Sequence, residues 1–222
     1  MIKTINGIQI PQSKMAQEAT ELVRDTESDL LFHHSSRVYY WGALAGQQRG
    51  LKVDAELLYV GCMFHDMGLT HDRCSCDKRF EVDGANAARD FLQGYGISPQ
   101  DIDKVWTAIA LHTTPGIPEF MAPEIALVTA GVEMDVLGIG FDQFTPQQIG
   151  AVTGWHPRPE AFKEEIIQAF YDGIKQKPQT TFGNVKADVI ADKEAGFKAG
   201  NFCEVIRQSR WPGRISDVVT IK

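Results

Sequence analysis

The sequence lacks several features that define whole classes of protein. No run of about 18 apolar residues occurs, so we expect no transmembrane helix. The first residues carry no long apolar stretch, so we expect no secretory signal peptide. Cysteine is scarce, and Cys62, Cys74, Cys76 and Cys203 show no spacing typical of a disulfide framework. These absences favour a cytoplasmic protein in a reducing compartment.

Basic residues are also fewer than acidic ones. Lys and Arg number 22 against 29 Asp and Glu, which gives a net charge of −7. With a pI near 5.4, nucleic acid and anionic membranes are disfavoured as main partners. We therefore expect a small-molecule substrate, and association of identical copies stays open.

Length and periodicity indicate one helical domain. The 222 residues, 43% of them hydrophobic, can fill a single core. We expect one domain over 1–222, with a core of about 14–177 and a C-terminal helix and tail over 178–222. Apolar residues recur at helical spacing along most of the chain, and we expect an all-α bundle with no obligatory sheet. Ser13, Asp54, Ser98 and Thr145 are the predicted N-caps.

Several helix boundaries follow from these signals. We expect helices over about 30–49, from Asp54 to the 65–66 pair, and from 80–84 onward. Further helices are expected from 98, from Pro123 and from Thr145. The last two are predicted over about 159–176 and around 202–206.

The segment 61–68 contains the residues that indicate function most clearly. An apolar helix runs directly into the adjacent pair His65 and Asp66. A buried carboxylate is costly unless it is paired or coordinates a metal. His34 and Asp135 also lie on apolar helical stripes. Two imidazoles and two carboxylates suit a divalent cation with positions left for water, which explains them more economically than four separate core residues.

Other polar residues have competing interpretations. His112 ends the apolar stripe of another helix, where it is suited to proton transfer or to a supporting hydrogen bond. Arg37 either binds an anionic group or braces its helix, and Asp83 is better explained as a helix cap. In the polar loop 70–79, His71, Cys74 and Cys76 form at best a weak zinc pattern, because a fourth ligand is missing.

The order of these residues resembles a known family. The motif HSSRV at 34–38, then His65-Asp66, then the distant Asp135, is similar to the signature of the HD-domain superfamily of metal-dependent hydrolases. The similarity extends over roughly 20–185 and is greatest to the cyanamide hydratase branch. The segments that carry this closer resemblance are 34–39, 56–66, 79–84, 107–112 and 134–138.

The resemblance implies a ligand set and a helical-bundle fold. It implies His34, His65, Asp66 and Asp135 as metal ligands, with Glu81 and His112 at the edge of the site. The Lys that follows the His-Asp pair in the phosphodiesterase branch is absent, because Met67, Gly68 and Leu69 stand there. Two-metal members also need two further histidines between the His-Asp pair and the last Asp. Only His71 and His112 are available here, and His71 follows Asp66 by just five positions, so we expect one divalent ion. Zinc is the first choice, with manganese or iron next.

The sequence leaves the chemistry open. We expect a cation to activate water, with Asp66 orienting it and His112 or Glu81 transferring protons. The substrate is either a small nitrile-like or amide-like molecule, or a phosphate ester bound by Arg73, Lys78 and Arg79. Tyr40, Trp41, Phe64 and Phe120 are candidates for the apolar pocket that the first substrate needs. A non-catalytic binding module is the third alternative, which the intact ligand set disfavours.

Overall fold

The chain folds into packed helices, as the periodicity predicts. The structure is a computed structural model that describes residues 4–201 and 203–204, and within these residues it contains helices and no strand. An isolated bridge between Ile5 and Ile8 precedes the first helix. The α-helices are α1 (Lys14–Thr26), α2 (Asp29–Gln48), α3 (Ala55–Phe64), α4 (Phe80–Gly94), α5 (Pro99–Leu111), α6 (Pro123–Val132), α7 (Pro146–Trp155), α8 (Phe162–Ile174) and α9 (Lys186–Lys193).

Short helical turns connect several of these helices. The 3₁₀ turns are η1 (Met67–Leu69), η2 (Pro118–Phe120), η4 (Phe141–Gln143) and η5 (Pro178–Thr181). A π-helical turn, η3 (Glu133–Leu137), continues directly from α6. π-helical turns inserted in or next to α-helices are often found at functional sites.

The structure confirms the predicted N-cap residues. The Ser13 hydroxyl accepts from the backbone N–H of Ala16, and Asp54 accepts from the N–H of Leu57. Thr145 forms a reciprocal capping box with Gln148. These side chains satisfy backbone donors that the first helical turn leaves without a partner.

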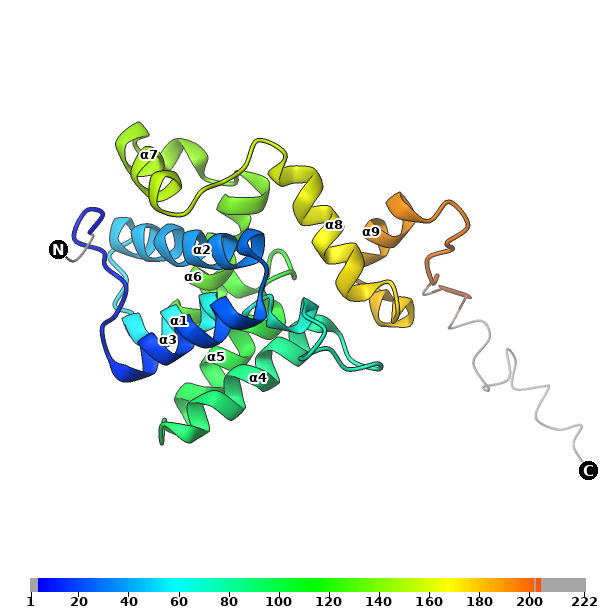
Figure 1. Ribbon diagram of the computed structural model, residues 1–222, viewed down its shortest axis with the longest axis horizontal. Helices are drawn as coiled ribbons and strands as arrows, with labels where there is room; N and C mark the ends of the chain where they lie inside the picture. The colour runs from blue at the N-terminus through cyan, green and yellow to red at the C-terminus, as the bar shows by residue number, and fades with distance from the viewer. Residues whose placement is uncertain (1–3, 202, 205–222) are drawn as a thin grey trace, which may run out of the picture.

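Helix α2 lies at the centre of the bundle and contacts α1, α3, α6, α7 and α8 (Figure 1). Its side chains are buried from Leu31 through to Gly46 with few interruptions. Helix α6 comes very close to it, because Gly131 faces the backbone carbonyl of Val38 and a Cβ there would overlap that oxygen. This close packing brings the end of α6, and with it Asp135, next to α2.

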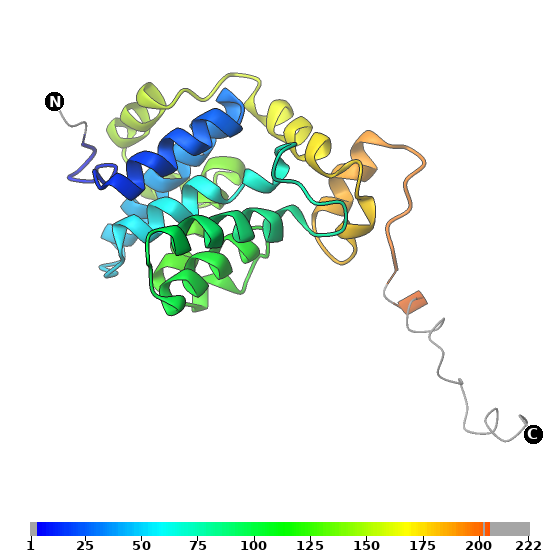
Figure 2. The ribbon, with the colours of Figure 1, turned by 60° about the horizontal axis from the view of Figure 1, so that its bottom comes forward.

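A second hydrophobic cluster holds α8 and α9 at the end of the bundle away from the N-terminus (Figure 2). It joins Phe162, Ile174 and Ile190 to Leu69 in η1 and Phe80 in α4. Both of those earlier residues follow His65 and Asp66 in the chain. The C-terminal helices therefore cover this part of the bundle.

Some sequence predictions differ from the structure. Helix α8 is shorter than the predicted 159–176, because the proline-containing segment before it stays irregular. Asp83 is not a cap; its carboxylate is buried and accepts from Ser75 and from Lys177. The helix expected around 202–206 falls mostly outside the described residues. No helix in the described part of the chain has the length and hydrophobicity needed to cross a bilayer.

Candidate metal centre

Three predicted ligands meet where α3 ends beside α2. His65 follows the last residue of α3, Asp66 leads into η1, and His34 lies in the second turn of α2. All three side chains are fully buried. Their ligand atoms form the one group of possible metal ligands found in the described residues.

The distances between these atoms suit one small cation. The Nε2 atoms of His34 and His65 lie 3.2 Å apart. Asp66 Oδ2 lies 3.2 Å from His65 Nε2 and 3.6 Å from His34 Nε2. Donors about 2.0–2.2 Å from a tetrahedral ion lie roughly 3.3–3.6 Å from one another. The triangle formed by these three atoms has the size that a single divalent ion requires.

The hydrogen bonds of the two imidazoles assign their tautomers. His65 Nδ1 donates to the carbonyl of Cys62 at 2.7 Å, and His34 Nδ1 donates to Asp135 Oδ2 at 2.7 Å. When each ring is neutral, as metal ligation requires, its hydrogen lies on Nδ1 and a lone pair is left on Nε2. Two lone pairs 3.2 Å apart repel each other, and a cation between them removes that repulsion.

Unsatisfied polar atoms beside this triangle support the same conclusion. Both oxygens of Asp66 and the Nε2 of His112 are buried, and none has a hydrogen-bond partner in the described structure. His112 Nε2 lies 3.7 Å from Asp66 Oδ1, while its Nδ1 is bonded to the carbonyl of Ile109. A buried carboxylate without partners is costly, so this donor set fits a cation and a water molecule.

Burial and the neighbouring charges shift the pKa values of these groups. Burial lowers the pKa of His65, but Asp66 outweighs that effect and raises it above its usual value, so a cation on Nε2 would replace the second proton of this ring. Burial raises the pKa of Asp66, but the neighbouring His65 and His34 outweigh it and hold the pKa below its usual range. Burial, together with the positive charge of His65, lowers the pKa of His112 to about 4. At neutral pH, therefore, Asp66 is an anion and His112 is a neutral acceptor.

Asp135 lies on the other nitrogen of His34. Its carboxylate accepts from His34, from Arg37 Nε at 2.8 Å and Nη2 at 2.8 Å, and from Trp41 Nε1 at 2.9 Å. These bonds engage both oxygens and hold the pKa of Asp135 below its usual range despite burial. The geometry makes Asp135 the partner that orients His34, and its predicted role as a direct fourth ligand stays a prediction.

Sequence reasoning missed how Arg37 and Trp41 serve this contact. Arg37 follows His34 by three positions and Trp41 by seven, so all three lie along one side of α2. That spacing was visible in the sequence. The single carboxylate that joins all three comes from η3 and was not predictable from α2 alone.

Glu81 belongs to a separate buried ion network that adjoins His112. Its carboxylate accepts from Arg79 Nη2 at 2.7 Å, from the Thr113 hydroxyl and from the ammonium group of Lys186. Burial raises the pKa of Glu81, but Arg79 and Lys186 outweigh that effect and bring it to about 2. Glu81 is thus an anion in an ion pair, and its predicted catalytic role stays a prediction. Lys186 and Thr113 were missed because they are distant in sequence.

The histidine and the two cysteines of the loop 70–79 do not join the ligand group. His71, Cys74 and Cys76 are exposed, and they form no ligand group in the described residues. Phe120, predicted as a pocket wall, is 83% exposed, and that prediction is wrong. The other three aromatic candidates are buried, and Phe64 packs against Phe91.

Comparison with known families adds one decisive match. The family model of the HD domain matches residues 31–143, just over half of the chain. The chain belongs to the HD-domain family. The matched region of this HD domain includes His34, His65, Asp66 and Asp135, and HD domains bind divalent metals. No curated protein matches the sequence significantly.

Proposed function

We propose that this HD domain is a metal-dependent enzyme that adds water to a small, uncharged nitrile-like substrate such as cyanamide. The observation that carries the proposal is the pair of unsatisfied acceptors, Asp66 Oδ1 and His112 Nε2, 3.7 Å apart beside the three ligands. Two acceptors at this separation call for a donor between them. A water molecule is such a donor, and it is also the reagent.

Each residue has a distinct role in this proposal. His34, His65 and Asp66 hold the cation, and Asp135 keeps His34 in the ligating tautomer. A divalent cation bound there supplies Lewis-acid activation of water. Asp66 Oδ1 orients the water, and the neutral His112 accepts its proton and returns it to the substrate nitrogen. Cyanamide and water combine into urea, so no group leaves.

The surroundings favour a small neutral molecule. The centroid of the Phe80 ring lies 5.6 Å from that of the His112 ring. The centroid of the Phe162 ring lies 5.8 Å from that of the His34 ring. The ligands themselves are fully buried. An enclosed site with apolar walls penalises a charged substrate more than a neutral one.

Phosphate ester hydrolysis has weaker support in the structure. Of the three loop cations that were candidates for phosphate binding, Arg79 is paired with Glu81 and Lys78 with Asp77. Arg73 is exposed in the loop 70–79. Two of these three cations are already paired, so a phosphate would have to compete with existing ion pairs for them. The expectations of a cytoplasmic location and of a small-molecule partner fit this proposal and stay predictions.

The test is a comparison of substrates on metal-reconstituted protein. The chain is loaded with zinc, manganese or ferrous iron and assayed for urea formed from cyanamide, and in parallel for phosphate released from p-nitrophenyl phosphate and nucleotides. We expect urea formation and no phosphate release. The His112→Gln variant should lose about 10²–10⁴-fold in kcat while still binding metal.

A matched histidine variant is the control. His71→Gln removes an imidazole from the exposed loop and should leave the rate unchanged. Phosphate release without urea formation would replace the proposal with phosphohydrolase activity. Metal binding without turnover of any of these substrates would leave a non-catalytic module.

A further inference from the structure

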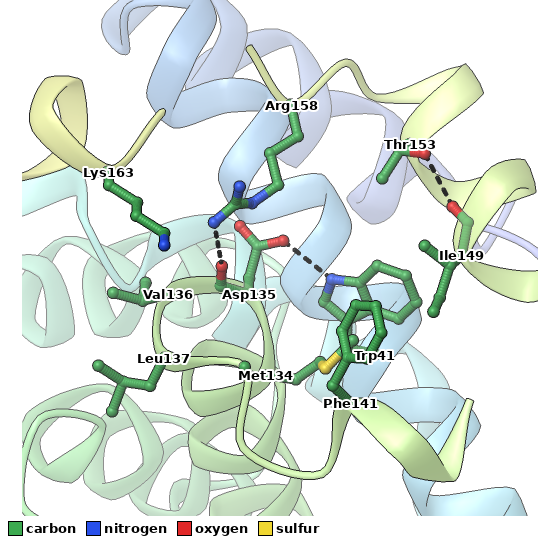
Figure 3. Close-up of a pocket in the computed structure, with 11 residues that line it drawn as sticks. Trp41, Met134, Asp135, Val136, Leu137, Phe141, Ile149, Thr153, Arg158 and Lys163 are labelled. Atoms are coloured by element: carbon green, nitrogen blue, oxygen red, sulfur yellow. Dashed lines mark hydrogen bonds between the residues drawn. The ribbon is translucent and has the colours of Figure 1, made fainter. Parts of the chain in front are cut away.

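A cavity of about 330 Å³ lies beside Asp135, bounded by η3, η4, α7 and the start of α8 (Figure 3). The cavity shares Asp135 and Trp41 with the contact that orients His34, but none of His34, His65, Asp66 and His112 lines it. Ligand pockets in proteins have volumes of about 300–1,000 Å³, so this one is large enough for a small organic molecule. Its lining has two chemically different parts.

One part of the lining is cationic. Figure 3 shows Lys163 and Arg158 directed toward the same space above Val136. Arg158 is half-buried, stacks over the ring of Phe162 at 4.1 Å and donates from Nη2 to the backbone carbonyl of Asp135 at 3.2 Å. These contacts fix the guanidinium group at the cavity wall.

These two positive charges have no matching negative charge in the wall. Asp135 is the one acidic residue in the lining, and its carboxylate is already engaged by Arg37, His34 and Trp41. Lys163 forms no ion pair with any described residue. The cavity therefore offers a local excess of positive charge in a chain whose net charge is −7.

The other part of the lining is apolar. It consists of Trp41, Met134, Leu137, Phe141 and Ile149. Leu137 is 68% exposed and Phe141 is 51% exposed, although both are large hydrophobic side chains. Contiguous exposed apolar surface next to polar groups is typical of a binding site.

We propose that this cavity binds a small amphiphilic anion, with a carboxylate or phosphate group on Arg158 and Lys163 and a compact apolar body against Trp41 and Phe141. The guanidinium fork suits either anion, because both offer two oxygens in a plane. The apolar walls then exclude water from the remainder of the ligand. The π-turn η3, which ends at the left-handed Gly138, shapes the wall between the two parts.

The test is calorimetric titration of metal-free protein with octanoate and, separately, with phenyl phosphate. EDTA-treated protein is used so that the result does not depend on the metal centre or on the proposed function. We expect saturable binding of at least one of these anions at one site per chain. Octanamide, which keeps the apolar body without the charge, should bind at least tenfold more weakly.

Variants locate the binding site. Lys163→Gln removes an exposed ammonium group that makes no ion pair with described residues, so folding should be unaffected, and affinity should fall several-fold. Adding Arg158→Gln should bring the total loss to at least tenfold. Lys52→Gln, which removes an exposed charge from the loop before α3, is the matched control and should bind as the wild type does.

Several results would overturn the proposal. One is absence of saturable binding by both anions, and another is equal affinity for octanamide. Unchanged affinity in the folded Lys163→Gln and double variants would place binding elsewhere. The relative affinities of octanoate and phenyl phosphate decide between a carboxylate and a phosphate ligand.

Discussion

Asp135 Oδ2 lies 2.7 Å from Nδ1 of His34, and this contact determines which nitrogen of His34 faces His65. The carboxylate comes from η3 and the imidazole from α2, so the close packing of α6 on α2 is what brings them together. A carboxylate on the far nitrogen of a ligating histidine raises the basicity of the ring and fixes its orientation. The packing of α6 on α2 thus positions His34 for the candidate metal centre.

Replacement of Asp135 by Asn should weaken metal binding by about 10–100-fold, because the amide keeps the shape but loses the charge that orients His34. Chelator competition at fixed pH measures the affinity. His71→Ala, in the exposed loop, is the control. An unchanged affinity would contradict the orienting role, and complete loss of binding would instead identify Asp135 as a direct ligand.

Replacement of Arg37 by Met should destabilise the protein by about 3–5 kcal/mol. The change leaves the buried Asp135 carboxylate without its bidentate partner, and an uncompensated buried charge costs energy on this scale. Urea denaturation gives the free energy of unfolding. Arg73→Met, at an exposed loop position, should stay within about 0.5 kcal/mol of the wild type. A small effect at Arg37 would show that the pair contributes little.

Replacement of Gly68 by Ala should be strongly destabilising and should weaken metal binding. A Cβ at this position would overlap the backbone carbonyl of Phe80, so η1 would have to move away from α4 and shift Asp66. Gly150→Ala is the matched control within α7, where nothing lies near the added methyl group. It should gain roughly 0.5–1 kcal/mol from helix propensity. Equal melting temperatures for the two variants would refute this packing argument.

Replacement of Glu27 by Gln should stabilise the metal-free protein at neutral and higher pH. Burial and the nearby charge of Asp66 raise the pKa of Glu27 well above 4.5, and its Oε1 has no hydrogen-bond partner in the described residues. The raised pKa means that folding favours the protonated form. This contribution is complete below about pH 4.5 and is lost as pH rises through the folded-state pKa.

The gain from this substitution should therefore grow with pH and reach on the order of 1 kcal/mol, the scale of a buried unsatisfied group. Thermal unfolding at several pH values, with EDTA present, measures it. Glu56→Gln, at a half-buried position on the first turn of α3, should show no such slope beyond that of the wild type. Parallel stability curves for Glu27→Gln and the wild type would contradict the assignment.

The sequence was sufficient where local rules act. Helix caps at Ser13, Asp54 and Thr145 follow from side chains that reach their own first turn, and the structure confirms them. His34, His65 and Asp66 were predictable because apolar helical stripes made their polar groups conspicuous. Each of these inferences depends on residues a few positions apart.

Contacts between distant segments could not be predicted in this way. Lys186 pairs with Glu81 and Lys177 with Asp83, so α9 and the turn after α8 are joined to α4 by two buried ion pairs. A lysine in a polar sequence window gives no sign that tertiary packing will bury it. The position of Asp135 on an apolar helical face was clear from the sequence. Its partners on α2 were not, because they depend on how α6 packs against α2.

The metal content of the purified protein tests the central claim most directly. Elemental analysis is made before and after reconstitution with a divalent metal, on the wild type and on Asp66→Ala. The ligand triangle predicts one equivalent per chain in the wild type and its loss in the variant. Two equivalents, or no uptake of any divalent metal by folded wild-type protein, would contradict a single-ion centre at His34, His65 and Asp66.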